Sequence, residues 1–283
     1  MRSKLFVPGS RPELFAKALA GDADALSFDL EDAVAMAGKA GARAAVAEFV
    51  GSDAVRNAAK AVIVRVNAPG TLEFEDDLAA VAREGVALLN LPKIESADAL
   101  QAAVVLIEHA ENKNGVGRPI RLLVNIETPK ALANAASIAA AHPRVAGLQL
   151  GLGDLFGPYG IDRNDSANVH AAMFAVKMAA AQAGVFALDG AYPDLEDAQG
   201  FSAEAGMARR LGFAGKSCIH PRQVAWANAA FAPSEEALAA ARRIVAAAEQ
   251  ATAQGSGVCV VDGRMIDLPY LKQALALLAS VRT

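Results

Sequence analysis

Short apolar runs typical of buried β-strands recur along the chain, and alanine-rich segments with helical spacing separate them. The predicted strands are Lys4–Val7, Ala25–Leu30, Ala61–Val66, Ala87–Leu91, Arg121–Ile126, Val145–Leu150, Val185–Leu188 and Gly215–Ile219. The predicted helices between them are Pro12–Leu19, Lys39–Phe49, Asp76–Arg83, Ala97–Glu111, Pro129–Ala140, Ala167–Ala183 and Glu196–Leu211. This alternation predicts an α/β protein of the (β/α)8 TIM-barrel type. An open doubly wound sheet is the alternative, but the segment Pro8–Arg11 lacks the glycine fingerprint of that fold.

The chain continues well past the eighth predicted strand. Its remaining predicted elements are helices over Pro221–Phe231 and Glu235–Thr252, strands over Val258–Val261 and Arg264–Ile266, and a helix over Pro269–Ala279. The dipeptide Asp262-Gly263 between the two short strands is a strong hairpin signal. We therefore expect a barrel domain at residues 1–232 and a C-terminal extension at residues 233–283 that acts as a lid.

Composition excludes several classes of function. The formal net charge is −4 and the isoelectric point is about 5.6, so no basic field favours nucleic acid or an anionic membrane. No apolar run is long enough to span a bilayer, and Pro8 interrupts the N-terminus before a signal-peptide core could form. The two cysteines give no disulfide framework. These observations predict a cytoplasmic protein without nucleic-acid or membrane partners.

Two acidic residues, Glu127 and Asp154, each follow an apolar run and lie about one strand–helix–strand repeat apart. Neighbouring parallel strands would bring both carboxylates to the same rim of the sheet. Paired carboxylates favour a hard divalent cation, and Mg2+ is the metal that we expect. The alternative is that both pair with Arg65 or Lys93 and bind no metal.

Polar residues also follow the other predicted strands, which is where barrel enzymes place their chemistry. Arg65 ends an apolar strand, and it could pair with Asp29 or Glu31, bind a substrate carboxylate or stabilise an enolate oxygen. We expect both kinds of role. Of Glu31 and Asp32, one could cap the next helix while the other points inward, and the residues alone do not decide between them.

For most of the remaining candidate residues, a structural role explains the sequence at least as well as a functional role does. Lys4, Arg11 and Lys39 lie near the first two loops and could meet phosphates, but a surface role fits each of them as well. Gly153 would let a ligand approach the backbone beside Asp154. His220 precedes a proline and is typical of a helix-start turn, and Asp267 is most simply the cap of the last helix.

Motifs along nearly the whole chain resemble the citrate lyase β-subunit-like enzymes of the HpcH/HpaI aldolase superfamily. The matching stretches are Leu5–Gly9, Asp29–Val34 with Lys39 and Arg43, Val64–Asn67, Leu91–Lys93, Ile126–Thr128, Gly151–Leu155, Gly215–Pro221 and Met265–Asp267. The specificity of this resemblance lies in the order and coverage of the motifs together, because each one alone is weak.

The resemblance implies a barrel that binds Mg2+ through Glu127 and Asp154. It implies reversible cleavage of a citryl-, malyl- or citramalyl-CoA thioester into acetyl-CoA and a 2-oxo acid. It also implies that Asp267 belongs to a lid, often from an adjacent subunit of a homotrimer or homohexamer, and takes part in acid–base chemistry. The expected catalytic residues are then Arg65, Asp267 and Glu31. The expected substrate-binding residues are Arg65, Asp29, Gly153, Lys4 and Arg11.

Two other functions stay open within this resemblance. One is a CoA-independent aldolase that acts on free 2-oxo acids. The other is the β subunit of a multi-protein citrate lyase, whose thioester would sit on a carrier protein. A scaffold without catalytic activity is the least favoured, because the key carboxylates and Arg65 are all present.

Overall fold

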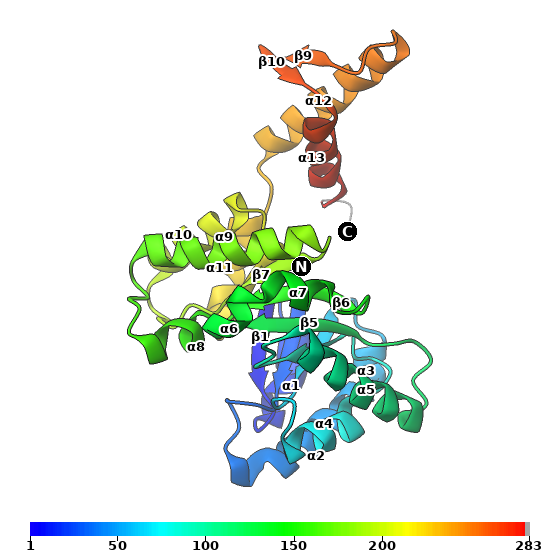
Figure 1. Cartoon of the computed structure of the whole chain (residues 1–283), viewed down its shortest axis with the longest axis vertical. Coiled ribbons are helices and arrows are strands. Elements are labelled where there is room, and N and C mark those ends of the chain that lie inside the picture. Colours follow the sequence, from blue (N-terminus) through cyan, green and yellow to red (C-terminus); the bar gives the residue numbers. More distant parts are fainter. Residues whose placement is uncertain (281–283) are drawn as a thin grey trace. The chain divides into compact units, whose positions relative to one another are not determined.

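The computed structural model describes residues 1–280, and its larger part is a closed barrel of parallel strands. The strands are β1 (Ser3–Pro8), β2 (Ala25–Asp29), β3 (Ala61–Arg65), β4 (Leu88–Leu91), β5 (Arg121–Ile126), β6 (Val145–Leu150), β7 (Phe186–Asp189) and β8 (Gly215–Cys218). They follow one another in chain order, and β8 pairs with β1 to close the ring. Figure 1 shows part of this barrel, with β1, β5, β6 and β7 among the helices. The predicted (β/α)8 fold is confirmed.

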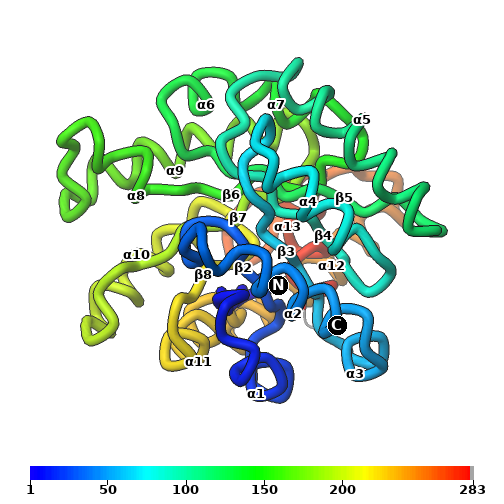
Figure 2. Tube along the Cα trace, turned by 90° about the horizontal axis from the view of Figure 1, so that it is seen from below, coloured from blue at the N-terminus to red at the C-terminus, as the bar shows by residue number. Residues whose placement is uncertain are grey.

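The helices of residues 1–231 surround the barrel strands, as Figure 2 shows. They are α1 (Phe15–Ala20), α2 (Lys39–Val50), α3 (Asp53–Arg56), α4 (Leu72–Val81), α5 (Ala97–Asn114), α6 (Pro129–Ala133), α7 (Ala135–Ala140), α8 (Leu152–Phe156), α9 (Ser166–Gln182), α10 (Ala198–Arg210) and α11 (Pro221–Phe231). Three single 3-10 turns are η1 (Pro12–Leu14), η2 (Met36–Gly38) and η3 (Gly157–Tyr159). The cover of helices buries the outer side of every strand in the barrel.

Two helices differ from their predicted bounds for local reasons. Helix α4 begins at Leu72 rather than Asp76, because the Thr71 hydroxyl accepts a hydrogen bond from the Phe74 N–H and caps the helix earlier. The helix predicted over Pro129–Ala140 breaks at Asn134, whose side chain donates to the Glu95 carbonyl oxygen. The short helices α3 and α8 were not predicted.

Alternate residues of each strand belong to two different cores. In β5, Leu122, Val124 and Ile126 belong to the large core between strands and helices, whereas Leu123 belongs to a small cluster inside the barrel. Since side chains of a strand alternate between its faces, Asn125 and Glu127 continue the inward side. The interior is therefore apolar at the N-terminal end of the barrel and polar toward the C-terminal ends of the strands.

The chain divides into two compact units, Met1–Phe231 and a second that begins at Ala232. In the second unit, α12 (Glu235–Ala253) packs against α13 (Leu268–Ala279), and a hairpin joins β9 (Cys259–Val261) to β10 (Arg264–Ile266). The hairpin turn has positive φ at Asp262 and Gly263, as a two-residue Asp-Gly turn requires. That this unit forms a lid stays a prediction. No helix in residues 1–280 is long and apolar enough to cross a membrane.

Candidate active site

A cavity of about 420 Å³ lies at the C-terminal ends of the barrel strands. Five of the predicted site residues line it: Asp29, Arg65, Glu127, Gly153 and Asp154. The rest of its lining comes from Phe6, Pro8, Ala33, Asn125, Gln149, Leu150, Gly151, Leu152, Arg163, Ala191, Pro193 and Ile219. The fold thus gathers side chains from β1, β2, β3, β5 and β6 around one space.

Glu127 follows the last residue of β5 and is almost completely buried. Its Oε1 accepts a hydrogen bond from the Lys93 backbone N–H at 2.7 Å, and its Oε2 accepts one from Asn125 Nδ2 at 2.9 Å. Burial raises the pKa of the Glu127 carboxyl, the two hydrogen bonds oppose this, and the nearby charge of Asp154 raises it further. Each oxygen keeps a second lone pair, which could bind a metal ion or substrate.

Asp154 lies in the first turn of α8 and is exposed to the cavity side of the barrel. Gly151 brings the two acidic segments together: a Cβ at this position would lie 2.6 Å from Glu127 Cβ and 3.0 Å from its Oε2. Around Gly153, by contrast, no described atom lies within 4 Å of such a Cβ. Gly151 therefore permits the close approach that puts Asp154 beside Glu127, while Gly153 leaves open space.

Within residues 1–280, neither Glu127 nor Asp154 forms an ion pair with a lysine or arginine. The two cations that could have neutralised them, Arg65 and Lys93, pair instead with Asp29, Glu31 and Asp32 (the first two of these are buried). The interpretation of Glu127 and Asp154 as plain salt-bridge partners thus has no support in the structure.

Arg65 is held in one orientation by carboxylates. Its Nε and Nη2 donate to the two oxygens of Asp29 at 2.8 and 2.6 Å, and its Nη1 lies 2.9 Å from Glu31 Oε2. The guanidinium carbon lies 5.0 Å from the centre of the Phe6 ring. This two-point pairing with Asp29 fixes the plane of the guanidinium at the cavity wall.

Glu31 lies behind Arg65, between it and Lys93. Its Oε1 is 3.0 Å from Lys93 Nζ, yet neither of its oxygens has hydrogen-bonding geometry within the described chain. Burial raises the pKa of the Glu31 carboxyl to about 7, and the positive charge of Arg65 opposes this rise. Lys93 itself has a φ of 55°, the left-handed conformation that aims its N–H at Glu127.

Three predicted phosphate contacts have other surroundings in the structure. Lys4 is fully buried inside the barrel, not near a surface loop, and its Nζ donates to Gln149 and lies 3.7 Å from the centre of the Phe6 ring. Arg11 is exposed and pairs with Glu13. Lys39 donates to the carbonyl oxygens of Leu30 and Glu31 at 2.9 and 3.0 Å. For Lys4 the expected place was wrong; for Lys39 the contacts brace the loop after β2.

His220 and Asp267 were both expected to have structural roles at helix starts, and the structure supports this only for His220. His220 Nδ1 accepts a hydrogen bond from the Arg222 N–H at the start of α11, as a helix-start turn requires. Asp267 occupies the N-cap position of α13, but its side chain accepts no capping hydrogen bond in the described chain. Capping therefore does not explain Asp267, which is exposed in the second unit.

Sequence reasoning missed three cavity residues. Asn125 and Gln149 are amides within otherwise apolar strand runs, and that interruption was the signal that could have identified them. Arg163 follows η3, and its two Nη atoms donate to Glu204 at 2.6 and 2.8 Å. Nothing in the sequence around Arg163 distinguishes it from a surface arginine.

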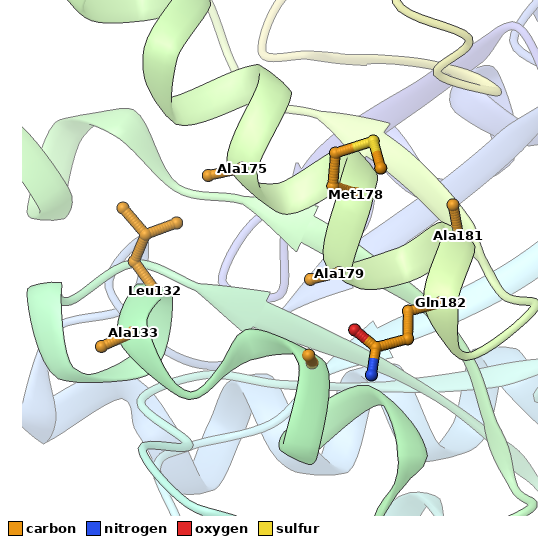
Figure 3. A pocket seen from close by; sticks show the side chains of 8 residues that line it. Leu132, Ala133, Ala175, Met178, Ala179, Ala181 and Gln182 are labelled. Atoms are coloured by element: carbon orange, nitrogen blue, oxygen red, sulfur yellow. The ribbon is translucent and has the colours of Figure 1, made fainter.

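Two further cavities differ in their relation to this site. One of about 750 Å³ lies beside β1, α1 and α11 and shares Phe6, Pro8 and Ile219 with the cavity at the strand ends. A shallow groove of about 540 Å³ lies between α9 and the α6–α7 segment (Figure 3). This groove is lined by Leu132, Ala133, Ala136, Ala175, Met178, Ala179, Ala181 and Gln182. It contains no ionisable side chain, so the chemistry belongs to the strand ends.

Comparisons with known proteins identify the family of this chain. Residues 2–221 match the family model described as HpcH/HpaI aldolase/citrate lyase. The chain is 34% identical over 277 residues to the citrate lyase subunit beta of Leuconostoc mesenteroides subsp. cremoris, covering 96% of this chain and 90% of that protein. It is 35% identical over 294 residues to the L-malyl-CoA/beta-methylmalyl-CoA lyase of Cereibacter sphaeroides, covering 96% and 92%.

A solved structure extends the likeness to the whole chain. CitE from Mycobacterium tuberculosis, in complex with magnesium, acetoacetate and coenzyme A, has a TM-score of 0.78 and 33% identity and covers all of both chains. The fold and these relatives define a barrel enzyme of the carbon–carbon lyase class. The chain belongs to the HpcH/HpaI aldolase/citrate lyase family. The predicted family and enzyme class are confirmed.

The close approach at Gly151 generates a paired prediction. Gly151→Ala should lower the free energy of unfolding by about 1–3 kcal/mol, because the added methyl group overlaps Glu127. Gly153→Ala, with open space around it, should change stability by less than about 0.5 kcal/mol. Urea unfolding followed by circular dichroism measures both. Equal losses at the two glycines would contradict the packing described at Gly151.

The raised pKa of Glu31 predicts a pH dependence of stability. The folded protein holds this proton up to about pH 7, whereas the unfolded chain loses it near 4.5, so Glu31 stabilises the fold at low pH. That contribution disappears as the pH rises through about 7. The stability of Glu31→Gln relative to wild type should therefore improve between pH 5 and pH 8. An opposite slope for Glu31→Gln would exclude the raised pKa.

Proposed function

We propose that this chain is a Mg2+-dependent lyase that cleaves a 3-hydroxyacyl-CoA of the citramalyl, malyl or citryl type into acetyl-CoA and a 2-oxo acid. The observation that carries the proposal is the charge arrangement of the cavity. Glu127 and Asp154 face it without a cationic partner in the described chain, while Arg65 is held at its wall. A retro-Claisen cleavage can use both features, a cation at the carboxylates and a positive charge beside the enolate oxygen.

The residues present fit a magnesium ion. Glu127 and Asp154 would supply the carboxylate oxygens that Mg2+ prefers, and the cavity leaves room for water and substrate oxygens beside them. No cluster of three or more His, Cys, Asp or Glu side chains in residues 1–280 forms a closed metal site. An open site with two protein ligands suits a catalytic ion. When bound, Mg2+ would supply Lewis-acid chemistry toward a substrate hydroxyl and carboxylate.

The chain's own residues would stabilise the charge that develops and return the proton. A general base takes the proton of the substrate hydroxyl, the C–C bond breaks, and its electron pair moves into the thioester carbonyl, giving an enolate and a 2-oxo acid. The acetyl carbon regains one proton, so no net proton is released. Arg65, held by Asp29, would stabilise the negative oxygen. Asp267 would then deliver a proton to the acetyl carbon.

Glu31 takes a different role in this proposal from the catalytic one expected at first. It contacts Arg65 and Lys93 and is not among the residues that line the cavity. We therefore infer that Glu31 acts through Arg65, by fixing the third side of the guanidinium, and does not exchange a proton with substrate. Gly153 keeps its proposed role, since it leaves open space beside Asp154.

The adjoining cavity supports a substrate with a long thioester arm. It meets the strand-end cavity at Phe6, Pro8 and Ile219, and most of its lining is apolar. A pantetheine chain is long and uncharged, so it suits such a channel better than a bare 2-oxo acid would. The relatives named malyl-CoA lyases, and the CitE structure that contains coenzyme A, favour CoA over a carrier protein.

Substrate choice, assembly and location extend the proposal. The CitE relative has also been solved with oxaloacetate and magnesium, which is in keeping with a 2-oxo acid product. We infer a homotrimer or homohexamer in the cytoplasm, in which residues 233–283 act as the lid that brings Asp267 to a barrel of residues 1–232. A CoA-independent aldolase and the β subunit of a multi-protein citrate lyase are the alternatives.

The first test is a mass-spectrometric turnover screen with citramalyl-CoA, malyl-CoA and citryl-CoA. We expect Mg2+-dependent release of acetyl-CoA with pyruvate, glyoxylate or oxaloacetate, and this should be lost with EDTA and in Glu127→Ala. Full metal-dependent activity in Glu127→Ala would refute the metal assignment. Turnover of free 2-oxo acids alone, or co-purification with carrier-protein subunits, would favour one of the two alternatives.

If Asp267 acts as an acid, its replacement should change kcat and leave KM nearly unchanged. Asp267→Asn should lower kcat by about 10²- to 10⁴-fold, the range that a positioned acid or base contributes, with little change in KM. Thermal unfolding of the same variant should match wild type, because the Asp267 side chain makes no capping bond in the described chain. A loss of stability with normal kcat would return Asp267 to a structural role.

A further inference from the structure

Three strands of the barrel place polar side chains in its interior, and two of these, Asn125 and Gln149, also line the cavity. Lys4 of β1, Asn125 of β5 and Gln149 of β6 are each at most 4% exposed. Polar groups at such depth are costly unless they are hydrogen-bonded. The hydrogen bonds among these three side chains therefore indicate their role in the protein.

These side chains form one continuous row that ends at Glu127. Lys4 Nζ donates to Gln149 Oε1, and Gln149 Nε2 donates to Asn125 Oδ1 at 3.0 Å. Asn125 Nδ2 then donates to Glu127 Oε2 at 2.9 Å. A fourth residue, Asn90 of β4, adds a second donor to Asn125 Oδ1 at 2.7 Å. Every bond of the row runs in the same sense, from Lys4 toward the carboxylate.

The chemistry of the two ends fixes that direction. A lysine amine has hydrogens to donate in either protonation state, and an ionised carboxylate can only accept. Each side-chain amide has an oxygen that accepts and an NH2 group that donates. Rotating either amide by half a turn would therefore place two acceptors, or two donors, at hydrogen-bonding distance from each other. Only one orientation of Gln149 and Asn125 satisfies both ends of the row. The row therefore presents an N–H donor to Glu127 by necessity.

We propose that Gln149 and Asn125 are positioning residues for the metal site: their directed row of amides, anchored by Lys4, holds Glu127 as a hydrogen-bond acceptor with its free lone pairs turned to the cavity. This inference rests on the proposed function, since it concerns the carboxylate expected to bind Mg2+. Neither Gln149 nor Asn125 needs to touch the metal, because both act through the orientation of Glu127.

Reversing the direction of the row gives a specific test. Gln149→Glu keeps the size of the side chain but offers only acceptors, so Asn125 must turn its amide over to donate to it. The turned Asn125 would then present Oδ1 to Glu127 Oε2, where two acceptors meet at about the present 2.9 Å. The variant gains a carboxylate next to Lys4, so loss of folding is not the expected consequence.

The measurement is the affinity of the purified protein for Mn2+, followed by the electron paramagnetic resonance of the free ion. Gln149→Glu should bind Mn2+ about 10- to 100-fold more weakly than wild type, the range known for residues that orient metal ligands. Gln149→Met should lose less, because Asn90 still donates to Asn125. Gln223→Glu is the matched control: Gln223 is as buried and bonded on both sides, to Ile219 N–H and the Tyr192 carbonyl, outside the row.

The outcomes separate this proposal from the one on which it rests. Weakened Mn2+ binding in Gln149→Glu, with affinity within about twofold of wild type in Gln223→Glu and normal thermal unfolding, would support the positioning role. Wild-type affinity in Gln149→Glu, while Glu127→Ala fails to bind, would overturn the positioning role and leave the metal site standing. Equal binding by wild type and Glu127→Ala would overturn both.

Discussion

Closure of the barrel by the β8–β1 pairing is the constraint on which the rest of the structure depends. A closed ring of parallel strands turns every second side chain into a common interior, which must then be filled in layers. Here the lower layer is apolar and is represented by Leu123, whereas Asn125 and Glu127 continue the same face of β5 as polar groups. The interior therefore becomes a scaffold for the site as well as a core.

The division of charge at the strand ends follows from this scaffold. Arg65 pairs with Asp29, and Glu31 and Asp32 lie within 4.0 Å of both Arg65 and Lys93, so the cations at the rim already have carboxyl partners. Glu127 receives only hydrogen bonds from neutral donors, the Lys93 backbone N–H and the Asn125 amide. In the described chain, neither Glu127 nor Asp154 has a cationic partner, so the cavity is arranged to receive positive charge from outside the chain. The proposed magnesium ion supplies it.

Much of the fold could be predicted from sequence because its signals are local. All eight strands were identified to within a few residues, since each is a short apolar run between helical segments. The errors were also local: the Thr71 cap moved the start of α4, and Asn134 divided one predicted helix into α6 and α7. Lys4 was misplaced because its sequence neighbours do not reveal which side of β1 faces the interior. Asn125 and Gln149 interrupt apolar strands in the sequence, but their role depends on hydrogen-bond partners in other strands, which only the fold brings together.

By itself, the sequence determined the barrel, the family and the two acidic residues expected at one rim, because strand periodicity and motif order are properties of the chain. Only the tertiary structure decided which charges pair. Asp29, rather than a metal ligand, takes the guanidinium of Arg65, and Gly151 lets the segment of Asp154 approach Glu127. The row from Lys4 to Glu127 likewise joins residues far apart in the sequence. Hydrogen bonds and ion pairs act over about 3 Å, so they are fixed by the register and closure of the strands, which no local pattern encodes.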